Sequence, residues 1–151
     1  MIFAFCGHAD FSGTVEYEKK VLDFLGERVG NNEAEMLLGG YGGFDQFAYE
    51  CCKKYKKDHP KIRLIYVTPY MTVEYQKKQL AEAQCRYDGI MYPAIEGKPL
   101  RYAILERNKR MAEMADCVIC AITHSFGGAY QMYCLAKRKN KEIYNITGKE
   151  I

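Results

Sequence analysis

Apolar and polar positions along the chain follow two alternating patterns. Short apolar runs rich in β-branched and aromatic residues predict strands, and longer stretches with apolar residues three and four apart predict helices. The expected strands cover residues 2–6, 35–38, 62–68, 117–122 and 143–146. The expected helices cover residues 15–29, 44–55, 72–83, 100–115 and 129–136.

This alternation of strands and helices is typical of a parallel sheet covered by helices. We therefore expect an α/β fold: a Rossmann-like three-layer sandwich of about five mainly parallel strands, with helices on both faces. The 151 residues suit one domain spanning 1–151. Residues 84–99, "QCRYDGIMYPAIEGKP", show no clear period and receive no element.

Three loops with glycine and small polar residues or histidine follow predicted strands. They are "CGHADFSG" (6–13), "GGYGGFD" (39–45) and "THSFGG" (123–128). Ligands of open α/β sheets bind outside the carboxyl ends of the strands, where such loops allow backbone N–H groups to approach an anion or a sugar. Any one of these loops also suits a plain turn. Because all three lie at one edge of the sheet, together they predict a binding crevice.

The loops lack the best-known nucleotide motifs. The first has no G-x-G-x-x-G, and no G-x-x-x-x-G-K-[ST] occurs anywhere in the chain. Cys117 and Cys120 form a CxxC within an expected strand, where residues three apart point to opposite faces and cannot chelate one metal ion. We therefore expect neither a metal site nor a cofactor.

Charge and cysteine content indicate which partners and which cellular compartment to expect. A net charge of +3 from 22 basic and 19 acidic residues argues against nucleic acid as a partner. The basic run 53–61 is interpreted as a solvated helix end rather than a phosphate contact.

Seven cysteines favour a reduced, cytoplasmic compartment, and no apolar stretch approaches the length of a membrane span. Thirteen tyrosines and seven methionines offer contact surface for a homodimer.

The helix "LRYAILERNKRMAEMA" carries further candidates for the site. Asn108 lies in the middle of its apolar face, so its amide must be paired either with a backbone carbonyl or with a ligand. Arg107 lies beside it, and a guanidinium can donate two parallel hydrogen bonds to a phosphate. Arg110 has the same chemistry, but we interpret it as a surface residue.

The run 106–136, "ERNKRMAEMADCVICAITHSFGGAYQMYCLA", resembles the core of the SLOG superfamily, the Rossmann-like group of the Lonely Guy phosphoribohydrolases and the DprA-like DNA-processing domains. "GGYGGFDQFAYECCKKY" resembles its second-strand glycine loop, and "FCGHADF" resembles the opening of its small stand-alone bacterial members. The resemblance spans nearly the whole chain. It implies that a nucleotide-derived ligand is surrounded by Gly7, His8, Gly39, Gly40, Gly42, Gly43, Arg107, Asn108, Ser125, Gly127 and Gly128.

The late loop departs from the Lonely Guy pattern P-G-G-x-G-T-x-x-E. It reads "FGGAYQMYC", so Cys134 stands where the resemblance implies a catalytic glutamate. Cleavage of an N-glycosidic bond passes through an oxocarbenium-like state that a carboxylate stabilises. The remaining catalytic candidates are Arg107, Asp45 and Glu50, with Glu106 a further carboxylate. Asp45 also suits a helix cap, and Glu50 is expected to face solvent.

Three functions are compatible with this pattern. The leading hypothesis is a sensor or carrier that binds a nucleotide or nucleotide-derived small molecule between the glycine loops and the Arg-Asn helix. The first alternative is an N-glycosidase of the phosphoribohydrolase type or a nucleoside deoxyribosyltransferase. The second is a DprA-like DNA-associated or protein-interaction module.

Overall fold

The computed structural model describes residues 1–69, 74, 80–93, 97, 99 and 102–149. Its centre is a six-stranded sheet in the order β4-β3-β2-β1-β5-β6, with every neighbouring pair parallel. The expected α/β sandwich is therefore confirmed, with one more strand than the pattern indicated. The strands are β1 (Ile2–Gly7), β2 (Ala34–Leu38), β3 (Ile62–Val67), β4 (Gly89–Met91), β5 (Cys117–Ala121) and β6 (Glu142–Asn145).

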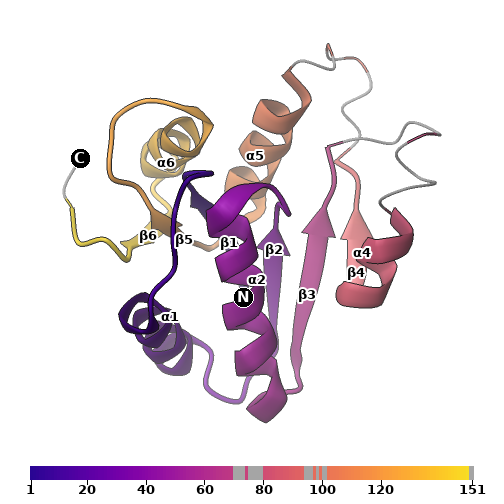
Figure 1. The fold of residues 1–151 in the computed structure, drawn as a ribbon, viewed down its shortest axis with the longest axis vertical. Helices are drawn as coiled ribbons and strands as arrows, with labels where there is room; N and C mark the ends of the chain where they lie inside the picture. The colour runs from indigo at the N-terminus through magenta and orange to yellow at the C-terminus, as the bar shows by residue number, and fades with distance from the viewer. Residues whose placement is uncertain (70–73, 75–79, 94–96, 98, 100–101, 150–151) are drawn as a thin grey trace.

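Four long helices cover the two faces of the sheet (Figure 1). On one face, α1 (Val15–Arg28) and α2 (Gly42–Asp58) pack over β1, β2 and β3. On the other, α5 (Ala103–Met114) and α6 (Gly128–Arg138) pack over β1 and β5 and against each other. A short helix, α4 (Ala81–Arg86), precedes β4.

The buried apolar residues form two clusters, one on each side of the sheet. Leu25 and Phe44 lie in the cluster under α1 and α2, and Met111 and Met132 lie in the cluster under α5 and α6. The two cysteines of the CxxC divide between them, Cys117 in the first and Cys120 in the second. This confirms that the pair points to opposite faces of a strand.

Two elements differ from the sequence prediction. Strand β4 lies in the stretch that received no element, because three residues beginning with glycine are too short to show a period of two. The helix expected over 72–83 falls mostly outside the described residues. What is described there is α4, which begins at Ala81.

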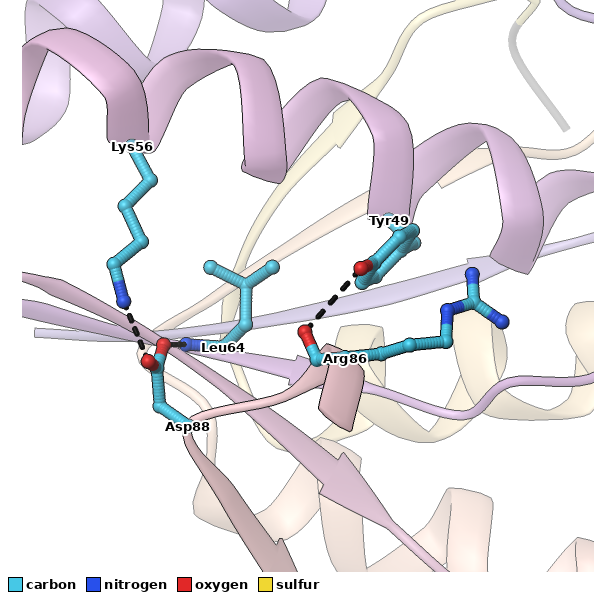
Figure 2. A network of polar contacts seen from close by, with 5 residues as sticks. All are labelled: Tyr49, Lys56, Leu64, Arg86 and Asp88. Atoms are coloured by element: carbon cyan, nitrogen blue, oxygen red, sulfur yellow. Dashed lines mark hydrogen bonds and ion pairs between the residues drawn. The ribbon is translucent and has the colours of Figure 1, made fainter. Parts of the chain in front are cut away.

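A polar network fixes α4 and β4 to the rest of the molecule (Figure 2). The Asp88 carboxylate pairs with the Lys56 ammonium at 2.6 Å and accepts the Leu64 amide at 2.7 Å. The Tyr49 hydroxyl donates to the Arg86 carbonyl at 3.2 Å. Burial alone would raise the pKa of Asp88, but the Lys56 and Leu64 hydrogen bonds outweigh it and the pKa is lowered. The Asp88 and Tyr49 contacts therefore join α2 and β3 to α4 and to the residue before β4, at the edge of the sheet.

The topology determines where a site can form. Strands β2 and β3 follow β1 toward one edge of the sheet, and β5, later in the chain, lies on the opposite side of β1. The order in which strands are added therefore reverses between β1 and β5, and such a switch point leaves a crevice at the carboxyl ends of the two strands. In the part of the chain that the structure describes, none of the helices is both long and apolar enough to cross a membrane.

Candidate functional site

A cavity of about 510 Å³ opens at the carboxyl ends of β1, β2 and β5. Its wall combines the loop after β1, the loop before α2, the first turns of α5 and the loop before α6. The residues in the wall are Phe5, Cys6, Gly7, His8, Ala9, Asp10, Gly39, Tyr41, Asp45, Ile104, Leu105, Arg107, Asn108, His124, Phe126, Gly127, Gly128 and Ala129. Its size is within the range of sites for small organic ligands.

Arg107 is the most deeply buried polar group of the wall, with 2% of its surface exposed. Its Nη1 donates to the Gly39 carbonyl at 2.7 Å and to the Val67 carbonyl at 2.8 Å. Its Nε donates to the Asn108 side-chain oxygen at 2.8 Å. The guanidinium therefore ties α5 to the ends of β2 and β3, and these donors already have protein partners.

The sequence pattern placed Asn108 in the apolar stripe and Arg107 beside it. In the structure Arg107 is the fully buried side chain, and Asn108 is only partly buried. The Asn108 side-chain oxygen accepts a hydrogen bond from Arg107 Nε, so this half of its amide is paired within the helix. Arg110 is exposed near Glu113, in agreement with its interpretation as a surface residue.

Asp45 is buried in the wall and lies in the first turn of α2, where it binds the residue before the helix rather than capping it from outside. The helix begins at Gly42, and the Asp45 carboxylate accepts the amide N–H of Tyr41 at 2.8 Å. Burial raises the pKa of Asp45 to about 6, although the Tyr41 hydrogen bond and the nearby Arg107 charge both lower it. The carboxylate therefore exchanges its proton in the weakly acidic range.

The glycines before α2 are surrounded by neighbouring atoms. A Cβ on Gly43 would lie 2.3 Å from the Phe11 carbonyl oxygen, and one on Gly42 would lie 2.8 Å from the Ala9 Cα. The Gly43 amide also donates to the Ala9 carbonyl at 2.7 Å. These glycines allow the loop after β1 to pack directly on the start of α2.

Three aromatic rings form a stack along the opposite wall. His8 and His124 lie with ring centroids 3.5 Å apart, and His124 and Phe126 lie 3.9 Å apart. His8 Nε2 accepts the Thr123 amide at 3.2 Å, which joins the loops after β1 and β5. Burial and the neighbouring His124 lower the pKa of His8, with Asp10 acting in the opposite direction.

The stack ends at the cavity mouth. Phe126 is 69% exposed, and Tyr41 on the facing loop is 61% exposed. The Nδ1 atom of His124 is buried and has no hydrogen-bond partner among the described residues. Flat apolar faces are thus presented at the cavity mouth, while the unpaired Nδ1 atom of His124 lies buried behind them.

The loop before α6 has empty space around Gly127, whereas neighbouring atoms pack closely against the glycines at the start of α2. Gly127 has φ +92°, with nothing within 4 Å of where its side chain would lie. Among the described residues, no side chain caps the start of α6. The first amides of this helix border the cavity at Gly128 and Ala129, in the position where helix N-termini bind anions.

The cavity brings together most of the residues that the sequence singled out. Gly7, His8, Gly39, Asp45, Arg107, Asn108, Gly127 and Gly128 line it. Gly40 and Gly42 line a neighbouring hollow of about 410 Å³, which shares Tyr41 and Asp45 with the cavity.

Three candidates, and the position of Cys134, lie elsewhere. Ser125 is exposed outside the described linings, and Gly43 is packed under the first loop. Glu50 is exposed and accepts the Gln46 amide, so it faces solvent as expected. Cys134 lines a separate hollow on α6, so the position where the resemblance implies a glutamate does not border the cavity.

Sequence reasoning missed the aromatic part of the wall. Tyr41 and Phe126 each stand next to a glycine in a loop already predicted to bind, and an exposed aromatic side chain in such a loop is a usable signal. His124 could not be recognised, because its contact with His8 spans most of the chain.

The described residues contain no group of three or more His, Cys, Asp or Glu side chains placed to hold a metal ion. The acidic members of the wall are Asp10 and Asp45, on the side of β1 and β2. The carboxylates, with the buried Arg107 cation near Asp45, therefore lie on one side of the cavity, and the helix amides lie on the other.

Comparison with known proteins gives a fold but no family model. Neither the protein-family models nor the curated proteins contain a match. Among solved structures, DNA processing protein A from Helicobacter pylori, described for its single-stranded DNA binding mode, matches with a TM-score of 0.62 and 21% identity. DNA processing protein A (DprA) from Streptococcus pneumoniae matches with a TM-score of 0.65 and 17% identity.

The matches cover nearly all of this chain but only part of the other proteins. They span 95% and 93% of this chain, against 63% and 48% of the two DNA processing proteins. The charge argument against nucleic acid as a partner is wrong, because a protein with this same fold binds single-stranded DNA. The chain has the Rossmann-like fold that DNA processing protein A contains, in agreement with the superfamily resemblance at the level of the fold.

Proposed function

We propose that this chain binds single-stranded DNA and that the cavity takes one nucleotide of the strand. The observation that carries the proposal is the pairing, at one cavity mouth, of exposed aromatic rings with an uncapped helix N-terminus. The first can stack on a base and the second can bind a phosphate. The shared fold with a protein that binds single-stranded DNA supports the same function.

The base is assigned to the rings at the mouth. Phe126 stacks on His124 through one face, and its 69% exposure leaves the other face available. Tyr41 approaches from the facing loop. In a duplex each base is already stacked on its neighbours, so this arrangement favours a single strand.

The phosphate is assigned to the side of α6. Asp10 and Asp45 lie on the other side of the cavity, where the Arg107 cation offsets the charge of Asp45 and donates to backbone carbonyls. The amides at Gly128 and Ala129 carry the positive end of the helix dipole. Arg107 shapes this site through its hydrogen bonds to Gly39 and Val67 rather than by clamping the phosphate itself.

The test is fluorescence anisotropy with a labelled dT oligomer of about 16 nucleotides, at low salt where phosphate contacts are strongest. The protein is expected to bind this oligomer more tightly than a duplex of the same length. Phe126→Ala should lower the affinity about 10-fold, the usual effect of removing one stacking ring. Tyr102→Ala removes an exposed ring that lies outside the cavity lining and is the matched control.

Two results would contradict the proposal. One is the absence of any binding to the dT oligomer by the parent protein at low salt. The other is an equal loss of affinity in Phe126→Ala and Tyr102→Ala, since this would place the strand away from the cavity.

A second candidate function is binding of a free nucleotide, as a sensor or carrier. It is favoured by the cavity volume of about 510 Å³, which suits one small ligand. Calorimetry with nucleoside monophosphates separates the two functions. A free nucleotide that binds more tightly than the dT oligomer, and that competes with it for the Phe126 side of the cavity, would identify the small molecule as the ligand.

A further inference from the structure

A groove between α5 and α6 continues from the cavity. A hollow of about 320 Å³ lies between the two helices and shares Leu105, Asn108 and Gly128 with the cavity wall. A further hollow along α6 shares Gln131 and Arg138 with it. We define the α5–α6 groove as these two hollows, lined by Leu105, Glu106, Asn108, Lys109, Gly128, Tyr130, Gln131, Met132, Cys134, Leu135, Lys137 and Arg138.

The groove is basic, in contrast to the acidic side of the cavity. Lys109, Lys137 and Arg138 line it and are exposed, and Glu106 is its one acidic residue. Among the described ion pairs none involves these three cations. The charge therefore changes sign from Asp10 and Asp45, across the start of α6, to the groove.

The direction of the groove suits a strand that leaves the cavity. It begins at Gly128, where the uncapped amides of α6 lie, and follows that helix to Arg138. Ten residues of helix extend about 15 Å, so a strand in the groove continues beyond the nucleotide held in the cavity. Tyr130 and Tyr133 stack with centroids 6.1 Å apart beside this path.

We propose that the α5–α6 groove binds the phosphate backbone of the DNA strand beyond the nucleotide in the cavity, with Lys109 and Arg138 as its main phosphate contacts. This inference rests on the proposed function, since it extends the same strand. Its basis is the complementarity between three cations without described ion-pair partners and an anionic chain entering from the cavity.

The test compares two double variants of equal charge change. Lys109→Gln with Arg138→Gln removes two cations from the groove. Lys53→Gln with Lys57→Gln removes two exposed cations from α2, within the basic run that the sequence interpreted as a solvated helix end. Affinity for a dT oligomer of about 16 nucleotides and for the dinucleotide pTpT is measured at several salt concentrations.

For the long oligomer, the groove variant should reduce the slope of log affinity against log salt by about 1.4, which is the loss of two phosphate contacts on a single strand. At low salt this corresponds to a loss of affinity of about 10-fold or more. The control variant should leave the slope unchanged. Binding of pTpT should change much less than binding of the long oligomer, because only one of its two nucleotides extends beyond the cavity into the groove.

The outcomes separate the groove from the cavity. If the groove variant and the control weaken binding of the long oligomer equally, the groove proposal is overturned and the proposed function still stands. Equal losses for the long oligomer and pTpT in the groove variant would also overturn it, because the effect would then lie in the cavity. A parent protein that binds neither probe would overturn the inference together with the proposed function. Urea unfolding of both variants checks that the surface substitutions leave the fold intact.

Discussion

The two glycine loops beside the cavity use their glycines in opposite ways. Before α2, the glycines lie where neighbouring atoms leave no room for a side chain, and Asp45 and Ala9 accept the nearby amides. Before α6, Gly127 is surrounded by open space and no side chain caps the helix. The first loop is closed by the protein itself, and the second is open to a ligand.

The difference shows why composition alone misjudges such loops. "GGYGGFD" has four glycines and "SFGG" has two, and the sequence predicted both loops to line the same binding crevice. In the structure the Asp45 carboxylate accepts the Tyr41 amide in this loop, so that donor is already paired within the protein. We therefore expect changes in the first loop to affect stability and changes in the second to affect binding.

The largest expected effect is on Arg107. Arg107→Met keeps an unbranched apolar stem but leaves the Gly39 and Val67 carbonyls without this donor, and it removes a cation near buried Asp45. The free energy of unfolding should fall by about 3 kcal/mol or more. Urea denaturation measures it. Exposed Arg110→Met is the control, and an equal small loss in both variants would show that the guanidinium does not hold the first loop.

Asp45 predicts a pH dependence of stability. Its pKa of about 6 in the folded protein lies above the ordinary 3.8, so the folded state binds more protons between these values. This contribution is present below about pH 4 and is lost as the pH rises through about 6, a change of about 2 to 3 kcal/mol. Urea denaturation across this range should show a smaller fall in Asp45→Asn. A variant with the same fall as the parent would assign the pH dependence to another group.

A smaller loss of stability is expected from substituting glycine, and its size should differ between the start of α2 and the start of α6. Gly43→Ala forces a methyl group against the Phe11 carbonyl, and we expect it to destabilise the protein by about 2 kcal/mol. Gly128→Ala meets only the flexible end of Leu105, at 3.3 Å, and should change stability by less than about 0.5 kcal/mol. Thermal unfolding compares the two. Similar losses at both positions would remove the distinction between a closed and an open loop.

The smallest expected change in stability is at Phe126. Because its ring is 69% exposed, Phe126→Ala should alter the free energy of unfolding by less than about 0.5 kcal/mol. Binding of the dT oligomer, in contrast, should weaken as described above. A large loss of stability would indicate that the ring serves the stack with His124 rather than a ligand.

Much of the fold could be predicted because its determinants are local. The two apolar periods located five strands and the four long helices, and short crossovers between parallel strands leave few arrangements. Strand β4 could not be found in this way. It is held to the sheet by pairing with β3, and its neighbour Asp88 is bound by residues on α2 and β3.

The sequence by itself determined the sheet, its helices and the edge where the three loops meet, because apolar periodicity and chain connectivity act over short stretches. Only the tertiary structure decided that Arg107 is buried, that Asp45 closes the start of α2, and that His8, His124 and Phe126 form one stack. Two of these depend on partners far away in the chain: Arg107 reaches the Gly39 carbonyl just after β2 and the Val67 carbonyl in β3, and the two histidines come from separate loops. Asp45 bonds a near neighbour, yet its burial and raised pKa depend on the surrounding fold. Burial and charge at the site are set by these packed neighbours, and a linear pattern does not contain them.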